Sequence, residues 1–368
     1  MKLTVKKSDI VKGVGKVIAA VNPRSTLPIL SNILMETKDS KTVHITGTDL
    51  EIGIISTIEA DITEKGEITI PAKKFLDIIR ETPEDEIEIQ VTKNNSISIK
   101  SGKAFFKLMG LPKDDFPKFP EVDMEKAIHI DQDVLKDCIN LTSFAISSDE
   151  TRYVLNGALM IVNNKKMKMI ATDGRRLAIS DRNVGIDKNI SFEAIVPTKA
   201  LQEVNKNINM QEKGTVALIE NGNQLIFVAD NTIIISRLIE GHFPNYEQVI
   251  PNEERITATV DREKFLSTIR RVSLLTSLES QAVKVDIIQN SKMIVSSRSP
   301  NLGESKEEIS LEKQQGEDIT IGFNPTYLID VLKVLDIDTV TLTLNSPEKP
   351  GVITGKEGYV YIIMPMQI

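Results

Sequence analysis

Short segments in which apolar and polar residues alternate dominate the chain, as expected for strands that bury one face of a sheet. The clearest pair lies in residues 167–179. Apolar residues alternate from Met167 to Ala171, a polar turn follows at Asp173-Gly174, and the alternation resumes at Leu177 and Ile179. This pattern predicts a β-hairpin whose turn lies at Asp173-Gly174.

A few segments have the spacing of amphipathic helices instead. Ile10, Val14 and Val17 follow a predicted strand over residues 2–6, and Ser8 is placed to cap that helix. The same pattern recurs at residues 130–142 and 260–272. A second kind of helix is predicted to begin beside a proline, since proline is favourable there, in the segments that start at Ile70, Val196 and Phe323.

These elements recur in a fixed order. A strand is predicted after the first helix of each copy, over residues 30–34, 155–159 and 283–287, and the third copy is predicted to close with a strand over residues 359–363. Thr48-Asp49 stand in a second hairpin pattern 124 positions before Thr172-Asp173, and Phe116-Pro117 precede Phe243-Pro244 by 127 positions. In a third copy the place of the hairpin is taken by residues 295–299, where the Thr-Asp pair is absent. The shared order at a period near 125 residues predicts that one domain occurs three times.

The predicted fold class is α+β, with two short helices and antiparallel sheets in each copy. Since the chain has 368 residues and 40% of them are hydrophobic, it is long enough for two or three folded domains. Proline-bearing, charged segments separate the copies, as is common for domain boundaries. We therefore predict domains over residues 1–121, 128–250 and 256–368.

Composition indicates a reducing compartment. The single cysteine, Cys138, excludes an internal disulfide. The first residues carry lysines but no apolar segment of a signal peptide follows, and no run of 18 apolar residues predicts a membrane span. We expect a cytoplasmic protein with no membrane partner.

Charge is distributed unevenly. The formal charge of −7 argues against a protein that coats nucleic acid by bulk attraction. The six predicted helices nevertheless sum to +5, which leaves −12 for the rest of the chain. Either the helices form a basic surface opposite acidic sheets, or they only have solvated faces; charge alone leaves both open.

Catalytic chemistry has little support in the sequence. His44, His129 and His242 are scattered over different parts of the repeat, and Cys138 lies beside the predicted core residue Ile139. Asp49 and Asp173 could act as a carboxylate pair, but aspartate at a tight turn more often bonds its own backbone. Gly13-Val14-Gly15-Lys16 lacks the glycine and the hydroxyl residue of a phosphate loop. We expect no catalytic residue, no metal and no cofactor.

Several motifs are shared with a known family. They are Leu27-Pro28-Ile29-Leu30, Gly47-Thr48-Asp49-Leu50-Glu51, Leu155-Asn156-Gly157, Ala171-Thr172-Asp173-Gly174, Arg176-Leu177-Ala178, Phe243-Pro244-Asn245-Tyr246 and Met364-Pro365-Met366. In these the chain resembles the bacterial DNA polymerase III β subunits, the sliding clamps. The resemblance implies a DNA clamp fold in which two protomers close head to tail into a ring around duplex DNA. It also implies a non-catalytic, nucleoid-associated subunit that gives processivity to DNA replication.

The resemblance also implies two sets of binding residues. Sequence-independent contacts to DNA would come from Arg24, Tyr153 and Lys199, and charge alone adds Lys12, Lys73, Arg270 and Arg271. A hydrophobic cleft would bind peptides of the DNA polymerase III alpha subunit, the clamp loader, other polymerases and repair proteins. Its expected residues are Leu155, Thr172, Gly174, Arg175, Arg176, Leu177, Pro244, Val249, Tyr327, Met364, Pro365 and Met366. The family often has His at Arg175, an aromatic residue at Val154 and a basic residue at Gln367.

The homodimer interface is expected at an edge strand over residues 103–108. There Phe106 and Leu108 point to one side of the sheet. By the resemblance the interface comprises Lys74, Ile78, Phe106, Leu108, Leu274 and Leu275, with Glu307 and Glu308 as ion partners. Two other classes remain open at this point: an enzyme that uses Asp49 and Asp173, and a repeat-built scaffold that binds peptides without touching DNA.

Overall fold

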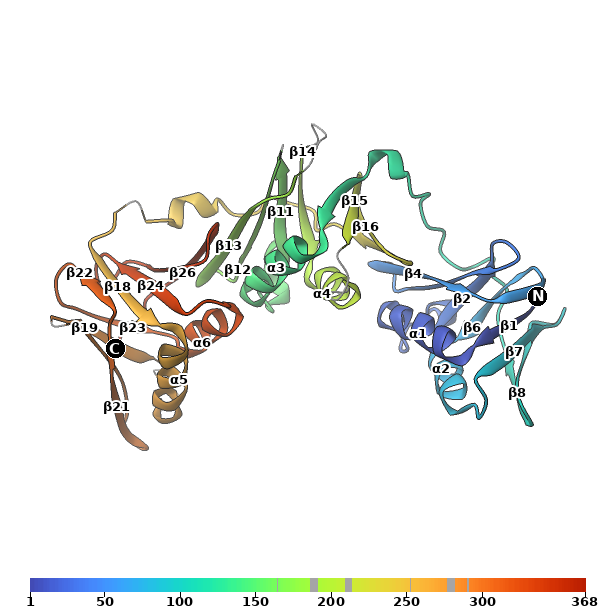
Figure 1. Cartoon of the computed structure of the whole chain (residues 1–368), viewed down its shortest axis with the longest axis horizontal. Helices are drawn as coiled ribbons and strands as arrows, with labels where there is room; N and C mark the ends of the chain where they lie inside the picture. Colours follow the sequence, from blue (N-terminus) through green and yellow to red (C-terminus); the bar gives the residue numbers. More distant parts are fainter. Residues whose placement is uncertain (164, 186–190, 209–213, 252, 277–281, 290) are drawn as a thin grey trace. The chain divides into compact units, whose positions relative to one another are not determined.

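The structure is a computed structural model of the chain. It describes residues 1–163, 165–185, 191–208, 214–251, 253–276, 282–289 and 291–368. These form two compact units, residues 1–133 with 199–238 (unit 1) and residues 134–198 with 239–368 (unit 2). Figure 1 shows both units as helices packed on antiparallel sheets. The middle third of the chain therefore contributes to both units.

The same series of elements occurs three times. The first series consists of β1 Lys2–Lys6, α1 Lys7–Val17, β2 Asn32–Thr37, β3 Thr42–Thr48, β4 Ile52–Glu59, β5 Asp61–Glu64, β6 Glu67–Pro71, α2 Ala72–Glu81, β7 Glu86–Val91, β8 Ser96–Ser101 and β9 Ala104–Met109. The second consists of β10 Ile128–Asp131, α3 Gln132–Thr142, β11 Gly157–Asn163, β12 Lys166–Thr172, β13 Arg176–Asn183, β14 Ser191–Pro197, α4 Thr198–Asn207, β15 Thr215–Asn221, β16 Gln224–Ala229 and β17 Thr232–Arg237. The third consists of β18 Ile256–Asp261, α5 Arg262–Val272, β19 Val283–Ile288, β20 Lys292–Ser299, β21 Gly303–Ser310, β22 Lys313–Gln315, β23 Ile319–Phe323, α6 Pro325–Val334, β24 Thr339–Leu344, β25 Gly351–Thr354 and β26 Tyr359–Ile363. The predicted α+β class and the triplication are confirmed.

Sheets of different repeats join edge to edge. In unit 1, β17 of the second repeat pairs with β4 of the first, which gives the eight-stranded order β10-β15-β16-β17-β4-β3-β2-β6. In unit 2, β26 of the third repeat pairs with β13 of the second in a nine-stranded sheet. The remaining sheets have the orders β5-β1-β7-β8-β9 and β21-β20-β19-β23. Among the described strands, β9 and β21 thus each have a single neighbour.

Helices bury one face against these sheets. In unit 1, α1 packs on β4 and β3 and against α2; in unit 2, α5 packs against α6 (Figure 1). Ile10, Val14 and Val17 of α1 are fully buried, in agreement with their predicted spacing. Gly13 lies on the same face, where a side chain would meet Ile58 of β4. The close packing of α1 on β4 therefore requires a glycine at this position. Within the described helices, none has the length and apolar character needed to cross a membrane.

Two local predictions are wrong. Ser8 does not cap α1: the helix begins at Lys7, whose N–H donates to the carbonyl of Asp85 at 2.7 Å, so Ser8 lies inside the first turn. The strands expected from Leu30 and Leu155 begin later, because both residues belong to short 3₁₀ segments, Pro28–Ser31 and Glu150–Leu155. Both leucines are still buried, which explains why their pattern resembles a strand.

Candidate functional site

The predicted hairpin in unit 2 is formed by β12 and β13, and its turn is held by its own side chains. Thr172 Oγ1 donates to the Arg176 carbonyl at 2.6 Å and accepts from the Gly174 N–H at 3.0 Å. Asp173 Oδ1 accepts the backbone N–H groups of Arg175 and Arg176 at 2.9 and 3.0 Å. Gly174 has φ +85°, a conformation that favours glycine. Four hydrogen bonds of the Thr172 and Asp173 side chains therefore hold the turn.

The first hairpin, between β3 and β4, repeats this pattern. Thr48 Oγ1 donates to the Ile52 carbonyl at 2.9 Å, and Asp49 Oδ1 accepts from the N–H groups of Glu51 and Ile52 at 3.0 and 2.9 Å. The prediction that both aspartates bond their own backbone is confirmed. Their carboxylates act as turn supports, which removes the observation that favoured an enzyme.

A pocket opens beside the second hairpin. Its volume is about 140 Å³. It is lined by Leu155, Thr172, Gly174, Arg175, Arg176, Leu177, Pro244, Asn245, Tyr246, Val249, Ile362 and Met364. Leucine, isoleucine, valine, methionine and proline side chains make much of this lining apolar, and two arginines add positive charge. Such a site suits an apolar group of a ligand.

Three of the predicted cleft residues lie beside this pocket without lining it. Tyr327 stacks on Arg176, with the guanidinium carbon 4.5 Å from the ring centroid. Met366 donates its N–H to the Gly322 carbonyl at 2.8 Å, so the chain turns away from the pocket after Met364, and Pro365 lies between the two. These three extend the apolar surface around the pocket but do not form its wall.

Three lining residues were not predicted. Ile362 stands directly opposite Leu177 across the β13–β26 pair, which places it on the same face of the sheet. Asn245 and Tyr246 adjoin Pro244, and the Asn245 side chain caps the 3₁₀ segment Tyr246–Val249. The motif Phe243-Pro244-Asn245-Tyr246 contained the last two, whereas Ile362 required the pairing of two repeats.

Arg176 links the pocket to two helical segments of unit 2. Its Nε donates to Asp173 at 3.0 Å, one terminal nitrogen to Asp330 of α6 at 2.7 Å, and the other to the Phe144 carbonyl at 2.6 Å. Burial opposes its charge, but the hydrogen bond to Asp330 and the nearby carboxylates leave the pKa of Arg176 above its usual value. Its charge is thus already balanced inside the protein.

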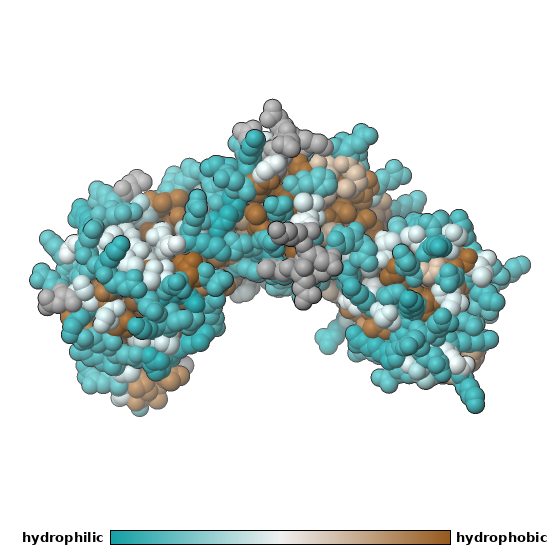
Figure 2. Space-filling view, in the orientation of Figure 1, coloured by the Kyte–Doolittle hydropathy of each residue, from teal (hydrophilic) through white to brown (hydrophobic). Residues whose placement is uncertain are grey.

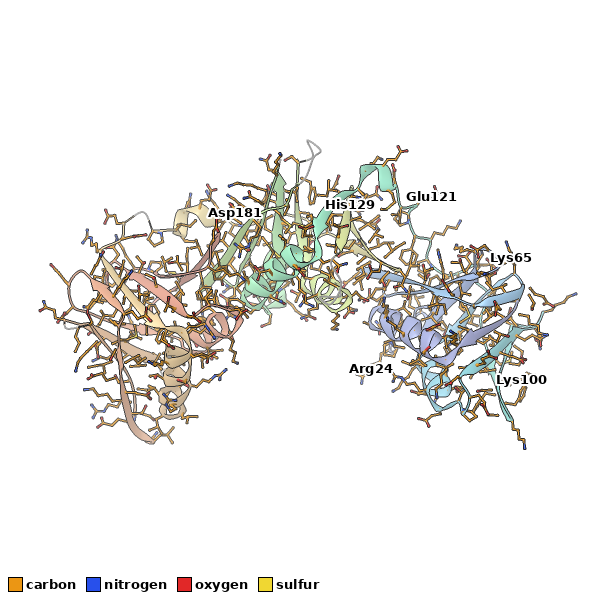
Figure 3. All side chains as sticks on the ribbon, viewed as in Figure 1. Arg24, Lys65, Lys100, Glu121, His129 and Asp181 are labelled. Carbon is orange, nitrogen blue, oxygen red and sulfur yellow. The ribbon has the colours of Figure 1, made fainter. Side chains whose placement is uncertain are left out.

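The three residues expected to contact DNA have different surroundings. Arg24 is exposed in the loop that follows α1, where Figure 3 shows it directed away from the sheets of unit 1. Tyr153 is half exposed, and its hydroxyl accepts the Glu240 N–H at 2.9 Å. Lys199 forms an ion pair with Asp49, so the hairpin of the first repeat contacts α4 of the second. Its charge is partly neutralised, unlike that of Arg24.

The expected interface residues fall on two surfaces, one in each unit. In unit 1, Phe106 and Leu108 are half-buried on the edge strand β9, and Lys74 and Ile78 lie on α2. In unit 2, Leu274 and Leu275 belong to the 3₁₀ segment after α5, and Leu274 is 76% exposed. Phe106, Leu108, Leu274 and Leu275 therefore leave apolar surface uncovered in a single copy.

The expected ion partners already have partners within the chain. Glu307 accepts from Arg271 Nε at 2.9 Å and from Thr268 Oγ1 at 2.8 Å. The hydrogen bond from Arg271 is the main cause that lowers the pKa of Glu307. Glu308 pairs with Lys292 at 2.7 Å, where both side chains are about half exposed. Glu308 can therefore leave its partner within the chain more easily than Glu307 can.

The histidines and the cysteine do not gather at the pocket. His44 is half-buried in β3, where burial and then Lys38 lower its pKa, and His129 and His242 are exposed. Cys138 is fully buried in α3, and its sulfur accepts a hydrogen bond from Ser180 at 3.4 Å. Its surroundings are those of an apolar core residue, as predicted.

Comparison with known proteins gives matches along the whole chain. Models of the N-terminal, central and C-terminal domains of the DNA polymerase III beta subunit match residues 1–120, 129–245 and 247–367. Beta sliding clamps of Chlamydia pneumoniae and Bacillus subtilis are 31% and 33% identical over 100% of this chain, and the matches cover 99% and 100% of those proteins.

The likeness extends to the fold. The crystal structure of the DNA polymerase sliding clamp from Bacillus subtilis superposes with a TM-score of 0.96 at 32% identity, covering 100% of this chain and 99% of that one. Family models, relatives and structure agree over all three repeats. The chain therefore belongs to the family of DNA polymerase III beta subunits, the bacterial sliding clamps, which are non-catalytic processivity factors of DNA replication.

Proposed function

We propose that two copies of this chain close head to tail into a ring around duplex DNA. The observation that carries this proposal is the pairing of repeats. Strand β4 of the first repeat pairs with β17 of the second, and the corresponding strand β13 of the second pairs with β26 of the third. The corresponding strands left over are β21 at one end of the series and β9 at the other, both on sheet edges. Pairing β21 of one copy with β9 of the next gives a heterologous interface, which closes when two copies use it twice.

The internal junctions also give a register for this contact. Ile54 stands opposite Ile234 in the first junction, and Ala178 stands opposite Tyr361 in the second. In the equivalent hairpins, Ser305 of β21 corresponds to Ile54 and Ala178, and Phe106 of β9 corresponds to Ile234 and Tyr361. The same register therefore places Ser305 of one copy opposite Phe106 of the next. It then places Glu308 opposite Lys103 and Glu304 opposite Lys107. Both of these glutamate–lysine pairs join opposite charges, which favours the register.

Exposed apolar residues supply the attraction. Phe106 and Leu108 of β9 would pack on Leu274 and Leu275 of the neighbouring copy, with Lys74 and Ile78 of α2 beside them. Leu274 is 76% exposed in one copy, so its burial would contribute about 1.5–3 kcal/mol. Replacing Leu274 and Leu275 with alanine is expected to yield monomers in sedimentation, and an unchanged dimer would contradict the assignment.

A closed ring needs only weak attraction to DNA, because topology prevents it from leaving sideways. We propose that Arg24, Tyr153 and Lys199 make sequence-independent contacts to the duplex. Such contacts weaken with salt but allow sliding, since no base is read. Arg24 is the strongest candidate, as it is exposed and its side chain has no hydrogen bond or ion pair in the described part of the chain.

The pocket beside the second hairpin is proposed to hold peptides of replication and repair proteins. It would take an apolar side chain among Leu155, Leu177, Val249 and Met364, with Tyr327, Pro365 and Met366 extending the contact surface. The DNA polymerase III alpha subunit, the clamp loader, other polymerases and repair proteins would compete for it, because one pocket of about 140 Å³ accepts one anchor at a time. Methionine lends such a surface the adaptability to accept different peptides.

The three domains are proposed to span residues 1–121, 128–250 and 256–368, in keeping with the family matches. The domains are joined by strand pairing across the repeats. A DNA-encircling role would place the protein in the cytoplasm, associated with the nucleoid.

Loading onto nicked circular DNA tests the ring directly. The clamp would be loaded with a clamp loader and ATP, and the DNA would then be cut once. Topological linkage predicts that the protein stays on the circle and is lost through the ends of the linear form. Equal retention on both forms would refute the ring. Peptide binding without any loading would favour a scaffold that does not encircle DNA.

A further inference from the structure

Within the chain, the hairpin turn of one repeat contacts the second helix of the next repeat. In unit 1, Asp49 in the turn after β3 forms an ion pair with Lys199 of α4. In unit 2, Arg176, which follows the turn after β12, donates to Asp330 of α6 and stacks on Tyr327. Both junctions thus follow one rule, in which the hairpin turn of a repeat contacts the second helix of the next repeat, although the residue types differ.

One turn and one helix remain. The turn of the third repeat lies at residues 300–302, between β20 and β21, and the helix is α2 of the first repeat. In the described part of the chain, side chains of neither segment have a hydrogen bond or ion pair to another repeat. A second copy is the natural partner of both, since the rule places this turn on the α2 of the next chain.

A groove lies on α2 at the position that the rule requires. Its volume is about 460 Å³. It is lined by Ile18, Val21, Pro23, Ser31, Pro71, Ala72, Lys73, Lys74, Leu76, Asp77 and Arg80. The matching segments Phe75-Leu76-Asp77 and Leu328-Ile329-Asp330 make Lys74 and Asp77 the counterparts of Tyr327 and Asp330. The groove therefore contains the counterparts of the two α6 residues that Arg176 contacts in unit 2.

The unused turn carries an apolar side chain suited to this groove. Leu302 is 59% exposed at the tip of the β20–β21 hairpin. Figure 2 shows hydrophobic surface at the lower end of unit 2, where this hairpin and the end of α5 lie in Figure 1. Ile18, Val21 and Leu76 give the groove an apolar wall, while Lys73, Lys74 and Arg80 stand around it.

We propose that Leu302 of one copy inserts into the α2 groove of the next copy and anchors the ring junction. The inference rests on the proposed head-to-tail ring and adds a contact outside the strand pair. Each of the two internal junctions uses an ion pair in which one side chain is largely buried, and such charges are costly to separate. An apolar anchor breaks no ion pair of its own when the junction opens. The junction between copies then separates at a lower cost in free energy than the two junctions within the chain.

A matched pair of variants tests the anchor. Leu302→Asn removes the apolar tip of the third hairpin, and Leu50→Asn removes a leucine of the first hairpin that is similarly exposed, at 51%. We expect Leu302→Asn to raise the dimer dissociation constant about 20- to 400-fold in sedimentation equilibrium, because a leucine that is 59% exposed in one copy would be lost at each of the two junctions of the ring. Leu50→Asn should leave it unchanged. Circular dichroism of both variants would verify folding.

The outcomes separate the anchor from the ring. A dimer of unchanged strength in Leu302→Asn overturns the anchor but leaves the ring standing, whereas a wild-type protein that is monomeric at all concentrations overturns the ring. Cysteine cross-linking gives a second readout. Leu302→Cys combined with Lys74→Cys should form a covalent dimer with oxidised glutathione, and Leu302→Cys with Lys41→Cys should not. Equal cross-linking of the two pairs would also overturn the proposal.

Discussion

Two consecutive arginines at the pocket differ in what balances their charge. Arg176 is committed to Asp173, Asp330 and the Phe144 carbonyl. The Arg175 side chain is exposed and, over the ranges that the structure describes, has no hydrogen bond or ion pair. Its carbonyl accepts the Met364 N–H at 2.9 Å, which holds the residue at the pocket. Arg175 is thus the cation available to a bound peptide.

We expect this chain to prefer peptides with an acidic residue beside the apolar anchor. An exposed ion pair contributes about 0.5–1 kcal/mol, so the acidic peptide should bind about two- to fivefold more tightly than its amide counterpart. Arg175→Gln should abolish the preference and Arg175→Lys should keep it. Fluorescence anisotropy with the peptide pair at low and raised salt provides the measurement. Equal affinities in the wild-type protein would contradict the assignment.

Cys138 should be chemically inert in the folded protein. Burial raises the pKa of its thiol to about 11, and the thiolate is the reactive form. Below that pH the thiol stays protonated, so Ellman's reagent should react at neutral pH only after unfolding. Because the folded pKa lies above the unfolded one, this group weakens stability as the pH rises from about 9 to about 11. Rapid reaction of the native protein would show that α3 opens readily.

At the scale of elements, two glycines should respond to alanine with opposite sign. A side chain at Gly157 in β11 would come within 2.4 Å of the Val196 carbonyl oxygen in β14, and backbone cannot move aside easily. We expect Gly157→Ala to destabilise by about 1–3 kcal/mol. Gly15 in α1 has open space, so Gly15→Ala should stabilise by about 0.5–1 kcal/mol. Thermal melting of both variants, side by side, checks the sign.

Local patterns in the sequence carried most of the element predictions. The helix expected over residues 260–272 is α5, and the closing strand Tyr359–Ile363 is β26 without change. Burial of alternate or helically spaced residues leaves a direct trace in the sequence. The errors arose where burial and secondary structure separate: Leu30 and Leu155 are core residues on 3₁₀ turns.

Contacts between repeats could not be predicted in this way. Ile362 enters the pocket only because β26 pairs with β13, and no local pattern specifies a partner strand nearly two hundred positions away. Likewise, the ion pair of Lys199 with Asp49 forms only because the fold brings helix α4 of the second repeat next to the hairpin turn of the first. The motif resemblance, rather than periodicity, located the pocket residues around Thr172 and Pro244.

At the scale of the whole molecule, the register proposed for the ring makes a charge-reversal prediction. Lys103→Glu would face Glu308 at both interfaces of the ring, so the dimer should weaken about 5- to 30-fold from ~0.5–1 kcal/mol at each. Adding Glu308→Lys should restore it. Sedimentation equilibrium of the two variants gives the comparison. Failure of the double variant to recover would indicate another register, since Glu308 gives up only its surface pair with Lys292.

The sheets that run across repeat boundaries have a consequence for taking the protein apart. A fragment ending at residue 121 contains every element of the first repeat, yet it strips β17 from β4 and exposes an edge bearing Ile52 and Ile54. Such edges template aggregation. We expect this fragment to precipitate or self-associate in light scattering, and a fragment ending at Leu238 to do the same because it strips β26 from β13, while the full chain stays dispersed. The smallest stable building block of this chain is then longer than its smallest repeating one.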